Sequence, residues 1–243
     1  TTKTKAIMPV HLTGRVCEMD KILKIAKKHS LFVIEDAAQS IGSKYKNRMA
    51  GTFGNVGCFS THPLKNLNAC GDGGFITTND YNIYKKASSL RNNGLIDRNN
   101  IETFGYLSRM DNIQAAILIY RLKNLNKIIF KRRNNALQYL QNIKNSKINM
   151  IFEKKYQFNT YHTFVIQTKY RNDLKSYLEK NNVETAIHYP IPIHMQAIAS
   201  KYVINKKNLK ITEEQSKNIL SLPIHQYLSK RDINRIISLI NNF

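Results

Sequence analysis

The chain has 243 residues, of which 42% are hydrophobic and 22% are charged, a composition typical of a folded globular protein and not of a disordered one. Its aliphatic runs are only about as long as a strand, so the sequence predicts no membrane-spanning helix, which needs roughly 20 apolar residues. Three cysteines at irregular spacing argue against a disulfide framework and for a reducing compartment, and we expect the cytoplasm.

The formal net charge is +22, from 38 basic and 16 acidic residues. Such an excess can neutralise the phosphates of nucleic acids, and a basic, noncatalytic nucleic-acid-binding protein is therefore one alternative. The segment 112–152 has no acidic residue, but its basic residues fall at spacings that scatter them around a helix. A solvated helix surface explains this pattern better, because no recognition-helix or aromatic stacking pattern accompanies the charge. We expect no nucleic-acid partner.

Hydrophobic periodicity in the first half of the chain predicts alternating strands and helices. The expected strands are residues 6–11, 31–35, 56–60 and 74–78, and the expected helices are residues 18–29 and 80–90. This alternation indicates an α/β fold with a mainly parallel sheet. Sheets of this kind bind their ligands outside the carboxyl ends of the strands.

The second half begins with residues 111–145, which lack proline and glycine and are predicted to form one long helix that links two domains. The pattern beyond it predicts strands at residues 161–168 and 183–188 and helices at residues 172–179, 213–220 and 230–241. We expect residues 1–125 to form the ligand-binding part of a large α/β domain. Residues 126–243 are expected to form the linking helix and a small C-terminal α+β domain.

Four polar side chains follow the predicted strands. Asp36 comes directly after strand 31–35, Gln39 lies three residues later, Ser60 ends another strand, and Lys65 follows in a loop before a glycine cluster. Pyridoxal phosphate needs a lysine to bind its aldehyde, an acid to keep its pyridine nitrogen protonated, and donors for its phosphate. Each residue alone is more often a helix cap or a solvated side chain. Their joint occurrence in this order predicts a pyridoxal phosphate site.

The segments that carry these residues resemble the DegT/StrS family of nucleotide-sugar aminotransferases; they are residues 33–42, 57–67, 71–74, 105–116 and 188–190. The resemblance implies a fold-type-I enzyme that depends on pyridoxal phosphate and works as a homodimer with shared active sites. It also implies transfer of an amino group, usually from L-glutamate, to a keto-deoxysugar carried on a nucleoside diphosphate, in the biosynthesis of amino sugars and polysaccharides.

By matching position, Lys65 resembles the catalytic lysine of the family, Asp36 the partner of the pyridinium, Gln39 a contact of the ring, and Ser60 a ligand of the cofactor phosphate. A sister branch carries histidine in place of this lysine and performs dehydration, so Lys65 favours transamination. His188 is by resemblance a contact of the sugar or its pyrophosphate, or else a hydrogen-bonded loop histidine. Arg109 is expected to contact the substrate or to form an ion pair at an interface.

Two departures from the family pattern bear on these expectations. Members commonly carry asparagine at the position of Leu107, where it reaches the cofactor phosphate of the neighbouring subunit, and leucine cannot donate a hydrogen bond. The family's first hundred or so residues have no counterpart, so the chain resembles a fragment. An inactive, truncated relative that only dimerises is the second alternative. No metal site is expected, because Cys58, His62 and Cys70 fit no familiar zinc spacing.

Overall fold

The computed structural model describes residues 1–202 and 209–243. The chain divides into two compact units. The first comprises Thr1–Phe130 and Lys154–His162, and the second comprises Lys131–Glu153 and Thr163–Phe243. One boundary falls inside helix α4, Leu125–Asn142, which therefore contributes to both units. No helix within the described ranges is long and apolar enough to cross a membrane.

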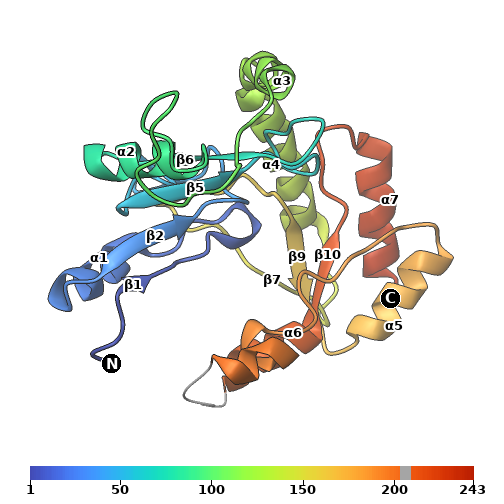
Figure 1. The fold of residues 1–243 in the computed structure, drawn as a ribbon. Helices are drawn as coiled ribbons and strands as arrows, with labels where there is room; N and C mark the ends of the chain where they lie inside the picture. The colour runs from blue at the N-terminus through green and yellow to red at the C-terminus, as the bar shows by residue number, and fades with distance from the viewer. Residues whose placement is uncertain (203–208) are drawn as a thin grey trace. The chain divides into compact units, whose positions relative to one another are not determined.

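The first unit contains a four-stranded sheet (Figure 1). Its strands, in spatial order, are β1 Ala6–Ile7, β2 Phe32–Asp36, β5 Val56–Ser60 and β6 Gly74–Thr77. β1, β2 and β5 run parallel, whereas β6 runs antiparallel to β5. The register pairs Asp36 with Cys58, so the carboxyl ends of β2 and β5 lie next to each other. Two of the polar residues singled out in the sequence, Asp36 and Ser60, are the last residues of these strands.

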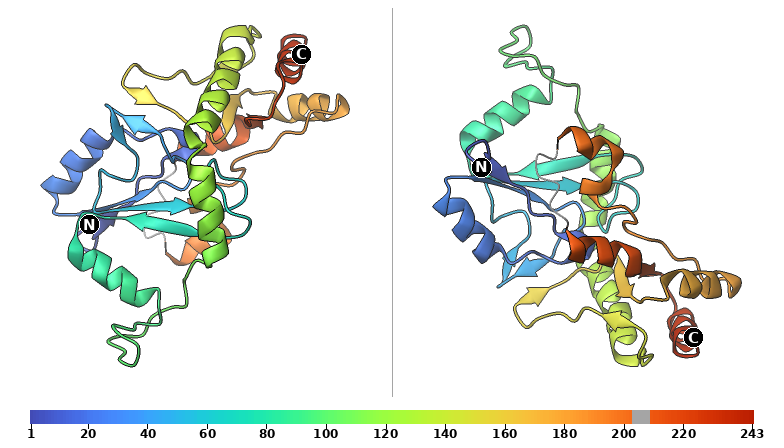
Figure 2. Two further views of the ribbon diagram at one scale, coloured as in Figure 1. Left: turned by 90° about the horizontal axis from the view of Figure 1, so that it is seen from above. Right: turned by 90° about the horizontal axis from the view of Figure 1, so that it is seen from below.

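Helices α1, Met19–Lys28, and α2, Tyr81–Leu90, lie on opposite sides of this sheet (Figure 2). The Asp80 carboxylate accepts from the backbone N–H groups of Asn82 and Ile83 and so caps α2. The same unit also contains a short 3₁₀ helix, Leu12–Gly14, and helix α3, Asn112–Leu122. A small antiparallel sheet in this unit consists of β3 Lys44–Tyr45, β4 Arg48–Met49 and β8 Gln157–Phe158.

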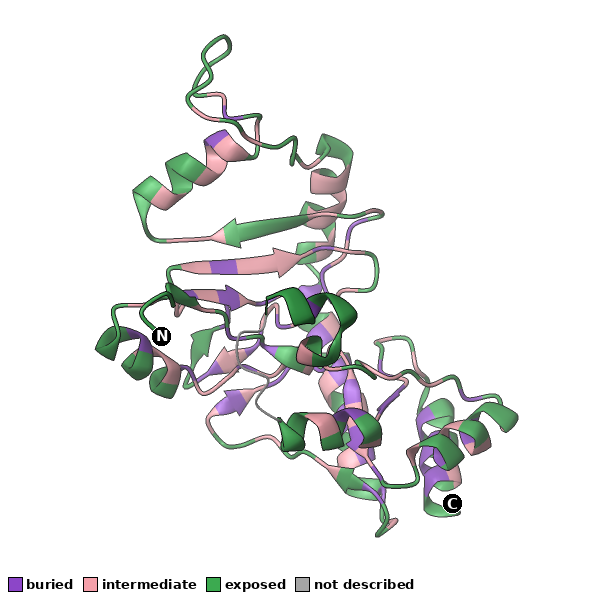
Figure 3. Cartoon of the chain, turned by 60° about the horizontal axis from the view of Figure 1, so that its bottom comes forward, coloured by how far each residue is buried: buried purple, intermediate pink, exposed green. Residues whose placement is uncertain are grey.

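The second unit is built on an antiparallel sheet of three strands in the order β10, Ile219–Leu222, then β9, Phe164–Gln167, then β7, Asn149–Met150. Its α-helices besides α4 are α5 Arg171–Lys180, α6 Lys210–Asn218 and α7 Lys230–Asn241, and its 3₁₀ helices are Ile193–Met195 and Ala197–Lys201. The buried stripe along α7 in Figure 3 consists of Ile233, Ile236, Ile237 and Ile240. This spacing of three and four residues is that of a helix with one apolar face.

The prediction of one helix over residues 111–145 was wrong, because α3 ends at Leu122 and α4 begins at Leu125. Asn124 lies in the break, where its N–H donates to Arg121 O and its carbonyl accepts from Ile128 N–H. Asparagine favours helix starts over helix interiors, since its side chain competes for backbone groups. The absence of proline and glycine was therefore not enough to predict a continuous helix.

Two predicted elements of the second unit differ in the structure, one in kind and one in where it ends. Residues 183–188 form no strand, because Ala186 alone among them pairs, with Ser221. Residues 213–220 are not all helical, since the chain leaves the helix at Asn218 and continues as β10 against β9. Pairing across the sheet decided the conformation of this short apolar segment, which local periodicity left ambiguous. Strands predicted at residues 6–11 and 161–168 are shorter in the structure, where β1 and β9 have two and four residues.

Candidate active site

A cavity of about 280 Å³ lies at the carboxyl ends of β2 and β5. It is lined by Met8, Ile34, Asp36, Ala38, Cys58, Phe59 and Ser60, all of which belong to the first unit. The cavity therefore combines an apolar wall with a carboxylate and a hydroxyl group. Ligand sites of α/β sheets commonly lie at this end of the strands, and a mainly apolar pocket with a few polar groups is typical of sites for small molecules.

The backbone of Asp36 is fixed on both sides. Its N–H donates to Pro9 O at 3.0 Å, and its carbonyl accepts from His11 N–H at 2.9 Å. Its carboxylate accepts from Ala38 N–H at 3.1 Å and lines the cavity. Because the side chains of a strand alternate between its two faces, Glu35 points to the opposite side of the sheet.

Glu35 is fully buried, and its carboxylate accepts four hydrogen bonds. Oε2 is bound by His11 Nε2 and Gly51 N–H, both at 2.8 Å, and Oε1 by Phe53 and Gly54 N–H, both at 2.6 Å. Burial raises the pKa of Glu35, but the hydrogen bonds from His11, Gly54 and Gly51 lower it more, so the pKa lies below its usual value. One ionised side chain thus ties residue 11 and the turn at residues 51–54 to the strand that carries Asp36.

Lys65 lies in the loop that connects β5 to β6. Its backbone N–H donates to His62 O at 2.8 Å, which closes a turn directly before the lysine. Partial burial lowers the pKa of the Lys65 amine, and the negative charge of Asp36 opposes this shift in part. The two side chains are therefore close enough to interact electrostatically. A lysine with a lowered pKa is more often neutral, and a neutral amine is the form that attacks a carbonyl group.

The hydroxyl of Ser60 accepts from His62 N–H at 3.3 Å at the edge of the cavity. Gln39 is half-buried, and its Oε1 accepts from Thr13 N–H at 2.7 Å. This hydrogen bond holds the amide of Gln39 against the short 3₁₀ helix that follows β1. Asp36 and Ser60 therefore line the same cavity at one end of the sheet, and Lys65 interacts electrostatically with Asp36, while the amide oxygen of Gln39 is bound to a neighbouring turn.

The other predicted site residues are not among those that line this cavity. Arg109 and Leu107 are exposed, in the segment between α2 and α3 of the first unit. His188 belongs to the second unit, where its Nδ1 lies 2.9 Å from Ser221 Oγ and its ring meets that of Tyr189 edge-on. This contact agrees with a hydrogen-bonded loop histidine.

Several residues of the cavity wall were not found from the sequence. Ile34 lies two positions before Asp36, and Cys58 two positions before Ser60, so strand alternation was a signal that could have identified both. Burial, and then the charge of Asp36, raises the pKa of the Cys58 thiol, which keeps it protonated at neutral pH. Met8 had no such signal, because its place depends on the pairing of β1 with β2. The described residues contain no group of three or more His, Cys, Asp or Glu side chains arranged to hold a metal ion.

The sequence model of one family, described as the DegT/DnrJ/EryC1/StrS aminotransferase family, matches residues 1–241. The chain belongs to this family. Aminotransferases of the DegT/DnrJ/EryC1/StrS family depend on pyridoxal phosphate. The predicted α/β fold of these enzymes is confirmed by a solved DegT/DnrJ/EryC1/StrS aminotransferase from Brucella abortus, with a TM-score of 0.94 and 35% identity, which covers 98% of this chain and 64% of that one.

Two further relatives bear on the chemistry. NtdA from Bacillus subtilis, solved with bound cofactor PMP, is 30% identical with a TM-score of 0.90 and covers all of this chain and 57% of that one. A dTDP-3-amino-3,6-dideoxy-α-D-galactopyranose transaminase from Aneurinibacillus thermoaerophilus is 39% identical over the whole of this chain and 66% of its own length. The chain thus spans slightly less than two thirds of the length of the curated relatives it matches.

Proposed function

We propose that the protein binds pyridoxal phosphate and transfers an amino group, with L-glutamate as donor, to a keto-deoxysugar carried on a nucleoside diphosphate. The observation that carries the proposal is the cavity at the ends of two parallel strands, which Asp36 and Ser60 line, together with the half-buried Lys65 amine that interacts electrostatically with Asp36. When bound, pyridoxal phosphate supplies an aldehyde that joins amines and a ring that accepts an electron pair.

The residues of the cavity fit this cofactor. Asp36 would hold the protonated ring nitrogen, because a carboxylate stabilises a cation beside it. The Ser60 hydroxyl would donate a hydrogen bond to a phosphate oxygen, and Gln39 would lie next to the ring. Ile34, Cys58 and Met8 would give an apolar wall beside the ring. Lys65 would hold the aldehyde carbon and then move the proton of the substrate as a general base and acid.

The nature of the substrate rests on the relatives. The transaminase from Aneurinibacillus thermoaerophilus is named for an amino-dideoxysugar on dTDP, and we infer a substrate of the same chemical class. Lysine at position 65, where histidine would serve dehydration, favours amino transfer. Arg109 is proposed as a contact for the negative charges of the substrate, and His188 as a contact for its sugar or pyrophosphate.

A homodimer with shared active sites is part of the proposal, supported by the unusual surface of α3. None of the α3 residues is buried, although the helix carries several large apolar side chains. Ile113, Ile119 and Tyr120 are each more than 60% exposed, and Phe104 in the preceding segment is 99% exposed. An apolar surface of this extent is typical of protein interfaces. We propose residues 1–125 as the cofactor-binding part, residues 126–243 as the linking helix and small domain, and the cytoplasm as the compartment, since all three cysteines are free.

The test is covalent labelling. The protein is mixed with pyridoxal phosphate, the product is reduced with borohydride, and peptides are analysed by mass spectrometry for pyridoxyl-lysine at position 65. We expect labelling of Lys65 and an absorbance band in the visible range that Lys65→Ala lacks. Lys24→Ala, which removes an exposed lysine of α1, is the matched control and should keep both signals. An unlabelled wild type, or an undiminished band in Lys65→Ala, would count against the proposed function.

A further inference from the structure

The loop that carries Lys65 is held by two side chains of α3. The Oε1 atom of Gln114 accepts a hydrogen bond from Cys70 N–H at 2.8 Å. The guanidinium of Arg121 donates to the carbonyl of Asn68 at 2.7 Å. Both bonds go to the backbone, three and five residues after Lys65. They therefore constrain the path of the loop whatever the identity of its side chains.

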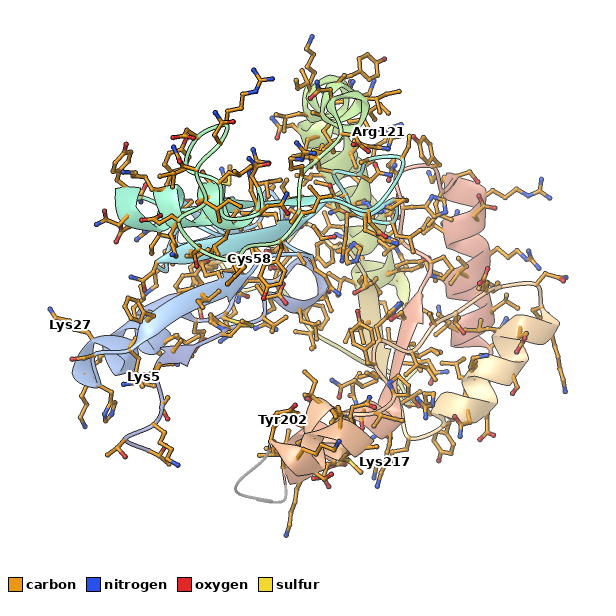
Figure 4. All side chains as sticks on the ribbon, in the orientation of Figure 1. Lys5, Lys27, Cys58, Arg121, Tyr202 and Lys217 are labelled. Carbon is orange, nitrogen blue, oxygen red and sulfur yellow. The ribbon has the colours of Figure 1, made fainter. Side chains whose placement is uncertain are left out.

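Gln114 and Arg121 lie on one face of α3, because side chains seven positions apart are two turns apart on the same side of a helix. Leu118 lies between them on that face and packs against a cluster formed by Leu67, Leu125 and Ile129. In Figure 4, Arg121 is labelled on α3. This face of α3 therefore contacts the loop through the apolar packing of Leu118, with one hydrogen bond formed by Gln114 and one formed by Arg121 on either side of it.

The loop is anchored at further points after Lys65. Asn66 Nδ2 donates to Thr160 O at 3.2 Å, and Ala69 N–H donates to Thr61 O at 2.7 Å. Gln114 also lies against the glycine that follows Cys70, since a Cβ atom built on Gly71 would lie 3.4 Å from its Nε2. Contacts therefore hold nearly every residue of the backbone from 66 to 71. The two hydrogen bonds from α3 hold residues 68 and 70.

We propose that Gln114 and Arg121 are positioning residues, which keep the Lys65 amine beside Asp36 and the cavity. The inference rests on the proposed function, because it assigns them to the lysine that would bind the cofactor. Without the two hydrogen bonds, the loop would populate other backbone paths, and the fraction of molecules with Lys65 in place would fall. The apparent rate of cofactor capture falls by the same fraction.

The experiment measures how fast pyridoxal phosphate is captured at Lys65, by borohydride trapping at successive times and mass spectrometry of the Lys65 peptide. Arg121→Met keeps the length of the side chain without its donor, and Gln114→Leu keeps the shape without the acceptor. Each should slow capture by about tenfold or more, the factor that corresponds to losing one hydrogen bond of average to high strength. Lys123→Met, an exposed substitution at the end of the same helix, is the control and should capture at the wild-type rate.

Conservative substitutions separate positioning from a general effect on the fold. Arg121→Lys keeps a charged donor, and Gln114→Glu keeps an acceptor for Cys70 N–H, so both should restore most of the capture rate. The thermal unfolding midpoint of every variant is measured together with its capture rate. A variant that captures pyridoxal phosphate slowly but unfolds at the wild-type temperature supports a positioning role. If an apolar variant at position 114 fails to fold, Gln114→Asn replaces it, because its side chain is one methylene shorter and no longer reaches Cys70.

The outcomes distinguish this inference from the proposed function. Wild-type capture rates in folded Arg121→Met and in folded Gln114→Leu or Gln114→Asn would overturn the inference, while labelling of Lys65 in the wild type would leave the proposed function standing. Slow capture in the conservative variants as well, in proportion to lost thermal stability, would also overturn it, because the effect would then be one on folding. A wild type that is never labelled at Lys65 would remove the proposed function and the inference together.

Discussion

Glu35 is the side chain whose replacement should destabilise the first unit most clearly. It is fully buried and accepts four hydrogen bonds, two on each carboxylate oxygen, from His11, Gly51, Phe53 and Gly54. Glu35→Gln keeps the shape but replaces one oxygen by an NH₂ group, which faces donors instead of accepting from them. Two of the four donors then lose their acceptor.

The magnitude follows from this count. A buried donor left without an acceptor costs about 1–3 kcal/mol, so two of them should lower the free energy of unfolding by about 2–6 kcal/mol. That is a large part of the total stability of a typical domain, which is about 5–15 kcal/mol. The measurement is urea unfolding followed by circular dichroism, where the midpoint should fall without a change in the slope m.

Glu18→Gln is the control, since Glu18 is also a glutamate but its lysine partners, Lys21 and Lys154, are exposed. We expect little change there, because exposed ion pairs contribute little to stability. A loss for Glu35→Gln no larger than that for Glu18→Gln would refute the reasoning from unpaired donors.

The pH dependence has a definite sign. The pKa of Glu35 is lower in the folded protein than its ordinary value of 4.5, so its contribution to stability is complete above that value and is lost as the pH falls through the lower, folded pKa. Acid titration of the unfolding free energy should therefore show a decline in the wild type that is smaller in Glu35→Gln. An equal decline in both proteins would assign the acid sensitivity to other carboxylates.

Three further substitutions test other parts of the structure. Asp36→Asn should weaken the binding of pyridoxal phosphate, measured by titration of the visible absorbance, by about tenfold or more, because the ring nitrogen loses an ionic hydrogen bond; unchanged affinity would argue against Asp36 as its partner. Tyr139→Phe should cost about 1 kcal/mol in urea unfolding, because the buried hydroxyl that donates to Pro223 O at 2.9 Å is removed while the ring stays; no loss would mean that Pro223 O finds another donor. Ser229→Ala should cost about 1 kcal/mol, since Ser229 caps α7 in a capping box with Asp232, whereas Ser238→Ala on the exposed side of α7 should be neutral; equal effects would contradict the capping argument.

The positions of the polar residues at the candidate site could largely be predicted from the sequence. Asp36 and Ser60 end apolar runs of strand length, and such runs reveal strand ends without knowledge of the fold. Lys65 follows five residues after Ser60, in the loop beyond the second of these strands. The face of the strand that carries Asp36 also follows from alternation, which is a local property of the chain.

The contacts that shape the site could not be predicted in the same way. Gln114 meets Cys70 across 44 residues of sequence and Arg121 meets Asn68 across 53. Glu35 likewise binds donors that lie before and after it in the chain, at residue 11 and at residues 51–54. Nothing in the spacing of these residues marks them as partners, since a long polar side chain on a helix or in a strand is usually solvated.

The sequence by itself determined the α/β alternation, most helix positions and the order of the polar side chains at the candidate site, because periodicity and side-chain chemistry are properties of short segments. Tertiary structure decided that residues 219–222 form a strand beside β9, where pairing outweighs local preference. It also decided which polar groups hold the Lys65 loop and the buried Glu35. These depend on strand register and on the path of each loop, which are set by the packing of segments far apart in the chain.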